Sequence, residues 1–503
     1  MIAGASCIHF NYSGIQNNRN LDSFAFIDAY EAASEIKKKN ISSLELTQLI
    51  VKRIKKFNPR INAIIVLNEE DALKRAQEAD TALARGENWG IFHGVPITIK
   101  DSFRVKGVVT TAGAPFLKDY VPEWDATAVA RLKNSGAVIL GHTNVPFLLS
   151  DHQSYNEIYG RTNNPWNLER TPGGSTGGGA AALAAGLTYL SIGSDIGGSI
   201  RVPAHFCGVF GHKPTVNLIS QNGHIPPVPG SPLFPSSELP VAGPLARSSR
   251  DLQLAISVCG GPDTPENIAY SWKLPEPRKK DIKEYKIKYV LDHPSCPVSS
   301  EIYPLMQQAI EEFKKENIDV KEGWPGEVIP DEQYMNYLYL LMGAMSQGLK
   351  DEEIEKIKAL PPGERSPFQE LQYRSITDSY LQYNIMESKR LQARQIWQNF
   401  FKEYDAFILP VAFVPAFPHT KEPWEKRKLY TPEGQRSFYD ILFWISFATL
   451  TGLPATVFPI GISSSGLPVG LQVIGPFLED ATSIKIAGNL NEIMGGIIHP
   501  KGY

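Results

Sequence analysis

The pattern of apolar and polar positions changes along the chain, from helical spacing near the N-terminus to alternating strand-like and helix-like segments. Residues 25–56 and 69–85 carry apolar side chains at helical spacing, which predicts two or three amphipathic helices. Ser42 or Ser43 is the expected N-cap of the helix that contains Glu45. The N-terminal part of the chain is therefore expected to be helical.

Short apolar runs follow, with a helix-like segment between them. Residues 95–100 (VPITIK) and 137–140 (AVIL) predict strands, and 125–134 (DATAVARLKN) predicts a helix. This order favours parallel pairing, with helices packed on the faces of a sheet. Residues 405–414 and 453–475 predict further strands with turns. The pattern as a whole predicts an α/β fold.

Composition distinguishes several other regions. Residues 178–190 are rich in alanine, as in a helix packed closely inside a protein. Residues 261–285 are rich in proline and charge and predict a surface crossing between two halves of one domain. The basic run at 278–280 is more typical of a solvated face than of a binding patch. Residues 301–316 and 331–358 predict helices.

Composition and charge exclude several classes of protein. The chain has 503 residues, 42% hydrophobic and 20% charged, which suits a large core and excludes a disordered chain. Lysine and arginine number 50 against 53 acidic residues, and the formal charge of −3 gives no field to attract nucleic acid or anionic membrane. We therefore expect a small-molecule substrate and no nucleic-acid partner. The sequence predicts no oligomeric state.

Cysteine spacing and apolar runs bear on the compartment. Cys7, Cys207, Cys259 and Cys296 lie far apart, without the spacing of a disulfide framework or a zinc site. Residues 1–14 lack a basic segment, and no run approaches about 18 consecutive apolar residues. We expect a cytoplasmic protein with no metal site, no secretion signal and no membrane span.

Two serines lie in glycine-rich segments within TPGGSTGGGAAALAAGLTYLSIGSDIGGSIR (171–201). A serine hydroxyl becomes a nucleophile only with a proton acceptor beside it and donors for the developing oxyanion. Near Ser199, Gly197 and Gly198 can aim successive N–H groups at one point, so the N–H groups from Ile196 to Ser199 form a candidate oxyanion hole. The same glycines would also suit a turn that only lets a helix pack closely.

Ser175 lies in GGSTG (173–177), which satisfies the GxSxG pattern of the nucleophile elbow in α/β-hydrolases. That elbow needs a strand directly before the serine. The preceding GRTNNPWNLERTP (160–172) contains two prolines and several polar residues, and predicts a loop. We therefore do not expect Ser175 to be an elbow nucleophile.

Four segments together resemble the amidase signature family of amide hydrolases. They are GVPITIKD (94–101), GRTNNPWN (160–167), TPGGSTGGGAA (171–181) and GSDIGGSIRVPAHFCGVFGHKPT (193–215). Lys100 precedes Ser175 by 75 residues and Ser175 precedes Ser199 by 24, the separations of that family. The likeness is dense over 90–260, whereas residues 261–404 match no family motif.

The resemblance implies a Ser–cis-Ser–Lys triad, with Ser199 as nucleophile, Ser175 as relay and Lys100 as base. Lysine is normally protonated at neutral pH, but desolvation favours its neutral form. Lys100 follows the apolar VPITI, so we expect it at the end of a buried strand, where its amine can accept a proton. For an isolated strand-end lysine, the alternative is an ion pair with Asp101 or another carboxylate.

The same resemblance implies roles for the residues around the triad. Asp195 and Arg201 are expected to hold the nucleophile loop through hydrogen bonds, the alternative being an ordinary ion pair. Thr176 stands where the family usually has serine. It keeps the hydroxyl but adds a methyl group, so we expect retained activity with a narrower site. The resemblance implies no cofactor.

The resemblance also implies an α/β amidase-signature fold, with a large mixed, mostly parallel twisted sheet covered by helices on both faces. We expect one domain over residues 1–503. It divides into N-terminal helices (22–88), a catalytic core (89–260), a variable substrate-side insertion (261–404) and the C-terminal part of the sheet (405–503).

Two apolar stripes bear on the substrate. Met335, Leu338 and Met342 share one face of a predicted helix that also carries several tyrosines, and Phe443 and Phe447 bound the segment FWISF. Such stripes are more often core than pocket. As pocket walls they favour an apolar acyl or aryl amide, or the matching ester.

We therefore predict an amidase that hydrolyses amide bonds through a serine acyl-enzyme. The loop after HKPT (216–246) does not resemble that of the family's tRNA-amidotransferase subunits, so a free-standing hydrolase is preferred over such a subunit. Two further hypotheses are an acyl-transferase and an inactive family member that serves as a binding protein. The intact Lys100, Ser175 and Ser199 argue against the inactive protein.

Overall fold

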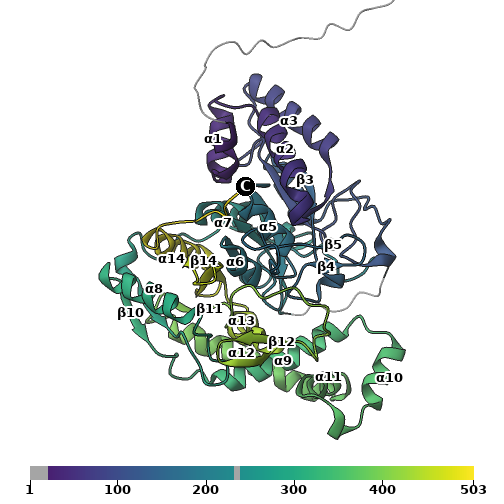
Figure 1. Cartoon of the computed structure of the whole chain (residues 1–503), viewed down its shortest axis with the longest axis vertical. Helices are drawn as coiled ribbons and strands as arrows, with labels where there is room; N and C mark the ends of the chain where they lie inside the picture. Colours follow the sequence, from purple (N-terminus) through teal and green to yellow (C-terminus); the bar gives the residue numbers. More distant parts are fainter. Residues whose placement is uncertain (1–20, 231–237) are drawn as a thin grey trace, which may run out of the picture.

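The structure is a computed structural model that describes residues 21–230 and 238–503 (Figure 1). Residues 1–14, Cys7 and part of the loop after HKPT (231–237) lie outside the described ranges. The helices are α1 (Ala29–Lys37), α2 (Ser43–Ile61), α3 (Glu69–Ala84), α4 (Thr127–Asn134), α5 (Gly177–Ala184), α6 (Arg201–Cys207), α7 (Ser249–Cys259), α8 (Tyr303–Lys315), α9 (Pro330–Ser346), α10 (Asp351–Ala359), α11 (Pro367–Thr377), α12 (Tyr380–Phe400), α13 (Leu442–Thr451) and α14 (Asp480–Ile493). The strands are β1 (Ile64–Leu67), β2 (Pro96–Lys100), β3 (Val138–Thr143), β4 (Tyr155–Asn156), β5 (Gly160–Arg161), β6 (Leu190–Asp195), β7 (Phe210–Lys213), β8 (Val241–Ala246), β9 (Lys286–Tyr289), β10 (Asp319–Glu322), β11 (Ala406–Pro410), β12 (Lys428–Thr431), β13 (Gly434–Ser437), β14 (Ala455–Ile462) and β15 (Pro468–Ile474).

One large sheet confirms the predicted mixed α/β fold. Its 11 strands have the order β1-β3-β2-β6-β8-β7-β14-β15-β11-β9-β10. Parallel pairs join β3 to β2, β2 to β6, β11 to β9 and β9 to β10. Antiparallel pairing predominates between β6 and β11, which differs from the mostly parallel sheet that was expected. The strands β14 and β15 illustrate the physical reason. Only residues 463–467 connect them, and so short a turn can join only antiparallel neighbours.

Helices cover the sheet in two layers. In one layer α5 and α6 pack on each other, α5 against β6 and β8 and α6 against β14 and β15. In the other layer α7 packs on β8, α14 packs on β14, and α4 lies against α7. Figure 1 shows α1, α2 and α3 at one end of the molecule and α9 to α12 at the other. No helix within 21–230 or 238–503 is long and apolar enough to cross a membrane.

Local signals in the sequence set several element ends. Ser42 caps α2 in a capping box, since its Oγ accepts the N–H of Glu45 and the Glu45 carboxylate accepts the N–H of Ser42. The helix predicted over 178–190 ends early, at Ala184. Gly186 adopts a φ of +65° shortly after, and β6 follows. Alanine content indicates helical preference but no end point, which here is set by the glycine.

The insertion region agrees with the predicted surface path. Residues 261–285 run mostly exposed, with short 3₁₀ turns at Glu266–Ile268 and Ile282–Glu284. The helix predicted over 331–358 is divided into α9 and α10. Two helices, rather than one long helix, therefore form this segment, and α9 packs against α11, α12 and α13.

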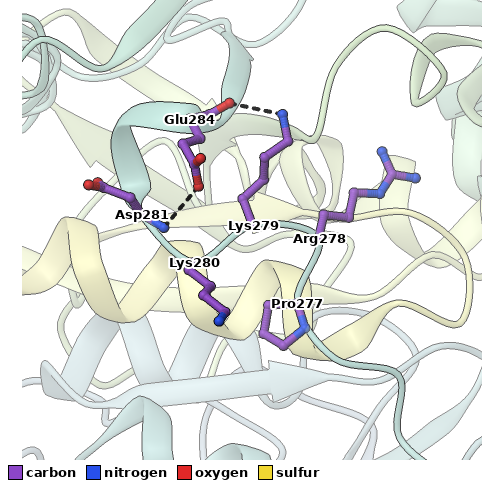
Figure 2. Close-up of a pocket in the computed structure, with 6 residues that line it drawn as sticks. All are labelled: Pro277, Arg278, Lys279, Lys280, Asp281 and Glu284. Carbon is purple, nitrogen blue, oxygen red and sulfur yellow. Dashed lines mark hydrogen bonds between the residues drawn. The ribbon is translucent and has the colours of Figure 1, made fainter.

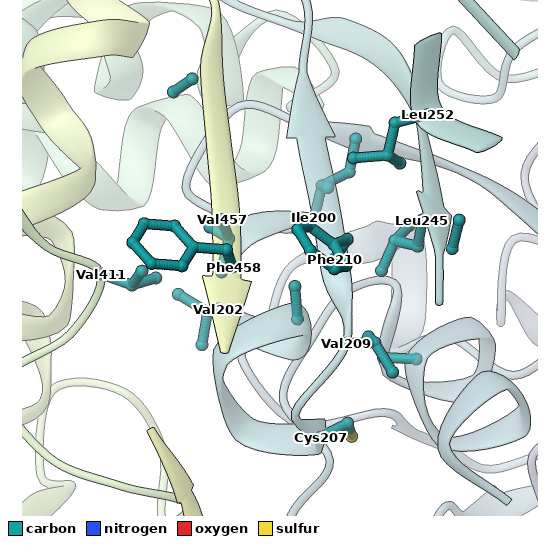
Figure 3. Packing of buried hydrophobic residues seen from close by; sticks show 14 of the residues in the cluster. Ile200, Val202, Cys207, Val209, Phe210, Leu245, Leu252, Val411, Val457 and Phe458 are labelled. Atoms are coloured by element: carbon teal, nitrogen blue, oxygen red, sulfur yellow. The ribbon is translucent and has the colours of Figure 1, made fainter. Parts of the chain in front are cut away.

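The core beneath the second serine loop is apolar and closely packed. Figure 3 shows Ile200 and Val202 among core residues that include Phe210, Val457 and Phe458. None of these five side chains is more than 2% exposed. Ile200 and Val202 flank the start of α6, and the others come from β7 and β14. The loop that ends at Ser199 thus rests on a rigid support, which the precise placement of a reactive group requires.

Candidate active site

Lys100 is the last residue of β2, and its side chain is fully buried. Its Nζ lies 2.7 Å from Ser175 Oγ, 2.9 Å from Ser194 Oγ and 3.4 Å from the Ser194 carbonyl oxygen. Burial lowers the pKa of Lys100 to about 7, although the charge of Asp195 opposes the shift. The amine is therefore largely neutral just above neutral pH and can accept a proton.

Asp101 binds other partners than the neighbouring lysine. Its carboxylate accepts hydrogen bonds from the Thr111 N–H at 2.8 Å and the Thr111 hydroxyl at 2.5 Å. Burial raises the pKa of Asp101 to about 7 despite these hydrogen bonds. Within the described ranges Lys100 forms no ion pair, so the alternative pairing of Lys100 with Asp101 is wrong.

Ser175 lies at the turn into α5, and the Gly174–Ser175 peptide bond is cis, as the resemblance implied. A Cβ on Gly174 would lie 2.2 Å from the Asp151 carbonyl oxygen, so only glycine fits where the two backbones approach. Residues 162–172 form turns and isolated bridges rather than a strand. The elbow interpretation of Ser175 therefore has no structural basis.

The methyl group of Thr176 packs against the protein interior. A Cβ on Gly193 would lie 2.5 Å from Thr176 Cγ2, and a Cβ on Gly179 would lie 3.3 Å from it. The absence of a side chain at Gly193 thus leaves room for both the methyl group and the hydroxyl of Thr176, the latter 2.7 Å from that Cβ position. The Thr176 N–H donates to the Ser199 carbonyl at 3.1 Å, which joins the two serine loops.

Asp195 and Arg201 form a buried pair that holds the loop from Ile196 to Ser199, the predicted nucleophile loop. Asp195 Oδ1 accepts the Gly198 N–H at 3.0 Å, and Oδ2 accepts the Ile200 N–H at 3.1 Å. Arg201 Nη2 and Nε lie 2.9 and 3.1 Å from the same carboxylate. Further Arg201 bonds reach the Ile445 carbonyl, Thr449 Oγ1 and Gln472 Oε1. Burial alone would raise the pKa of Asp195, but the Arg201 charge and these hydrogen bonds lower it to about 2.

The four predicted oxyanion donors are not equivalent. Gly198 has a φ of +90°, and its N–H is already bound to Asp195. A donor aimed at a carboxylate does not face a substrate oxygen, so the inclusion of Gly198 in the oxyanion hole is wrong. The N–H groups of Ile196, Gly197 and Ser199 are the remaining candidates.

Two helices from outside the motif region, α9 and α13, border the loop from Ile196 to Ser199. Tyr337 on α9 donates its hydroxyl hydrogen to the Ile196 carbonyl at 2.9 Å. Leu442 and Ile445 on α13 lie 3.4 and 3.1 Å from the positions that side chains on the two loop glycines would occupy. All three border side chains are buried. The surroundings of the loop are therefore mostly apolar, with one phenolic hydroxyl.

The residues predicted to bind substrate lie in different surroundings. Met335 is 47% exposed, so it does not share the buried face of Leu338 and Met342, and the predicted stripe is wrong at this position. The rings of Phe443 and Phe447 pack on each other, within an aromatic cluster that includes His293 and Trp324. On a helix of about 3.6 residues per turn, these two rings point away from Leu442 and Ile445. The segment FWISF does reach the site, but through a different face.

Two buried polar residues were not predicted from the sequence. Ser194 was not singled out, although it is a hydroxyl residue in the buried strand LSIGSD, directly before Asp195. Lys213 is a second fully buried lysine, and its Nζ donates to the carbonyls of Pro214 and Leu453. Burial and the charge of Arg201 lower the pKa of Lys213 to about 7. Its contacts are with backbone only, which is typical of a structural role.

A surface pocket of about 590 Å³ lies away from these residues (Figure 2). Its lining is Pro277, Arg278, Lys279, Lys280, Asp281 and Glu284. Arg278 pairs with Glu479, and Lys279 lies 3.6 Å from Asp405. Two cations of the basic run are thus already paired within the chain. Among the residues the structure describes, no group of three or more His, Cys, Asp or Glu side chains could hold a metal ion.

Fold and site together define a class, an α/β enzyme in which a buried lysine, rather than a histidine, contacts a serine loop. A family model described as Amidase matches residues 45–484. The chain belongs to this amidase signature family.

Several relatives and solved structures are similar to this chain over most of its length. A glutamyl-tRNA(Gln) amidotransferase subunit from Moorella thermoacetica is 32% identical over 486 residues, 92% of this chain and 95% of the relative. The solved structure of the same kind of subunit from Thermotoga maritima has a TM-score of 0.73 at 26% identity, covering 95% of this chain and 98% of the other. A crystal structure described as an amidase has a TM-score of 0.75 at 28% identity, covering 93% and 99%. Other sequence relatives, from Bdellovibrio bacteriovorus and Thermus thermophilus, carry the same amidotransferase name.

Proposed function

We propose that this chain breaks an amide bond through an acyl-enzyme on Ser199, with Lys100 as base and Ser175 as relay. Ser199 Oγ attacks the carbonyl carbon while its proton passes through Ser175 Oγ to the neutral amine of Lys100. The oxyanion binds backbone N–H groups of the nucleophile loop. When the C–N bond breaks, the proton returns through Ser175 to the leaving nitrogen, which departs as ammonia or an amine.

The second half of the reaction, in which the acyl-enzyme breaks down, uses the same proton route through Ser175 and Lys100. Water, or a second nucleophile, attacks the acyl-enzyme and gives its proton through Ser175 to Lys100. The ester bond breaks, Ser199 regains a proton, and the acid or transfer product leaves. The observation that carries this proposal is the 2.7 Å contact between Lys100 Nζ and Ser175 Oγ in a fully buried setting. Only a lysine with a lowered pKa can both accept and return the proton near pH 7.

An amidotransferase subunit is the first candidate for the physiological role. Relatives of that name match nearly the whole of both chains. An amidotransferase passes nitrogen from one amide to another acyl group, so amide cleavage on a serine would form its first half. In this role the chain would work beside partner subunits and release ammonia from a primary amide.

A free-standing hydrolase of apolar acyl or aryl amides, and of the matching esters, is the second candidate. The specific observation is the apolar border of the nucleophile loop. Leu442 and Ile445 occupy the space beside the loop glycines, and the hydroxyl of Tyr337 is already bound to Ile196. An amino-acid amide brings charged groups that need polar partners, which these side chains do not offer.

A substrate screen separates these candidates. Glutamine, asparagine, aryl amides, fatty amides and matching esters are offered to the chain alone, and ammonia, amine and acid are measured. Ammonia from glutamine supports the amidotransferase role, whereas turnover of aryl or fatty amides supports the hydrolase. Added hydroxylamine captures the acyl group as a hydroxamate and reports acyl transfer. Ser199→Ala should abolish turnover, and the exposed Ser257→Ala serves as control. An active Ser199→Ala variant contradicts the proposed function.

A further inference from the structure

Tyr337 reaches the nucleophile loop from far along the chain. It lies 141 residues from Ile196, on a helix outside the motif region, and its hydroxyl donates to the Ile196 carbonyl at 2.9 Å. The side chain is fully buried, and burial raises the pKa of Tyr337 well above its ordinary value. The hydroxyl therefore stays protonated at every working pH and remains a donor.

The hydrogen bond from Tyr337 to the Ile196 carbonyl also fixes the direction of the Gly197 N–H. A trans peptide unit is planar, and its C=O and N–H groups point in opposite directions. The Ile196 carbonyl and the Gly197 N–H belong to one such unit, so a hydrogen bond that fixes the carbonyl also fixes the direction of the N–H. Glycine has no side chain to restrict this rotation. An external anchor is thus needed at this position.

The other peptide units of the loop have their own anchors. The Gly198 carbonyl accepts the Val202 N–H at 2.7 Å, which fixes the Ser199 N–H in the opposite direction. The Gly198 N–H itself is bound to Asp195. Val202 and Asp195, which anchor these peptide units, belong to the motif region. The Ile196–Gly197 peptide is instead anchored by Tyr337, which lies on α9.

We propose that Tyr337 is a positioning residue for the oxyanion hole. Its hydroxyl holds the Ile196–Gly197 peptide so that the Gly197 N–H, together with the Ser199 N–H, faces the reacting carbonyl oxygen. This inference rests on the proposed function. Tyr337 touches no reacting atom in this role. Loss of its hydroxyl frees one donor to rotate, which weakens binding of the oxyanion in the transition state more than binding of the substrate.

Tyr337→Phe tests the inference, because it removes one oxygen and keeps the buried ring. Tyr339→Phe is the matched control, since Tyr339 lies on the same helix, is 1% exposed, and bonds to Asp378 at 3.2 Å. The probe is an alkyl fluorophosphonate, whose phosphoryl oxygen occupies the oxyanion site as Ser199 attacks phosphorus and fluoride leaves. We expect Tyr337→Phe to react about tenfold more slowly than wild type, while Tyr339→Phe stays within about twofold. With the best amide from the substrate screen, kcat should fall in parallel and KM should stay within about twofold.

The outcomes distinguish the inference from the function on which it rests. Equal rates in the two tyrosine variants overturn the inference and leave the proposed function intact. A slow Tyr337→Phe whose Tm drops well below that of Tyr339→Phe, or whose KM rises as much as kcat falls, also overturns it, because a packing role would explain both. A wild-type chain that forms no adduct on Ser199 overturns the proposed function and the inference together.

Discussion

Replacing Lys100 with methionine keeps the length of the buried side chain and removes its amine. Burial lowers the pKa of Lys100 from its ordinary 10.5 to about 7 in the folded protein. Each unit corresponds to about 1.4 kcal/mol, so a protonated Lys100 costs about 5 kcal/mol of folding free energy. The variant does not carry this cost.

The pH dependence of that cost has a definite sign. Between about pH 7 and pH 10.5 the unfolded chain holds the lysine proton and the folded chain does not, so unfolding takes up a proton. The free energy of unfolding of the wild type should therefore rise with pH, by up to about 1.4 kcal/mol per pH unit. Below pH 7 both states are protonated and the full cost applies, and above pH 10.5 it is absent. Other titrating groups, such as Lys213, are common to both proteins and cancel in the difference.

Urea unfolding of wild type and Lys100→Met across this range measures the effect. From about pH 7 to pH 9, wild type should gain about 2 kcal/mol relative to the variant. The absolute difference also contains hydrogen bonds that methionine cannot make, so the prediction concerns the change with pH. A difference that stays constant would show that Lys100 titrates like an exposed lysine and would refute the reasoning.

Under the proposed function, the same titration of Lys100 also governs activity. The kcat/KM of the wild type should rise about tenfold per pH unit below about pH 7 and level off above it, because the base must be neutral. Lys100→Met should lose about 10²–10⁴-fold in kcat at the optimum.

Three further substitutions test the contacts around Lys100 and the two serine loops. Arg201→Lys cannot make the five side-chain hydrogen bonds of the guanidinium, so urea unfolding should show a loss of about 3–5 kcal/mol, and a loss below about 1 kcal/mol would contradict the buried network. Gly193→Ala should destabilise by about 1–3 kcal/mol, because its Cβ would lie 2.5 Å from Thr176 Cγ2 and 2.7 Å from Thr176 Oγ1. Adding Thr176→Ala removes both atoms and should restore part of the lost free energy of unfolding. Ser194→Ala removes the hydroxyl 2.9 Å from Lys100 Nζ, and kcat should fall about tenfold while stability changes by only about 1 kcal/mol; an unchanged kcat would assign Ser194 to packing alone.

Short-range signals made the secondary structure largely predictable. The capping box at Ser42, the strand that ends at Lys100 and the crossing at 261–285 each depend on residues close together in the chain. The motif resemblance added the cis peptide before Ser175, which no composition or spacing implies. Strand pairing was harder to predict, because apolar runs show burial but not which neighbour a strand meets.

The sequence by itself determined the elements of the core, the family and the pairing of Lys100 with Ser175, since periodicity, glycine positions and motif spacing are all written along the chain. Only the tertiary structure decided which backbone N–H groups of the loop from Ile196 to Ser199 are free to bind a substrate oxygen. Asp195 binds the Gly198 N–H, and Tyr337 anchors the Ile196 carbonyl across 141 residues of chain. The physical reason is that a hydrogen bond depends on direction and distance in space, and helices such as α9 and α13 reach the site only after the sheet has brought distant segments together.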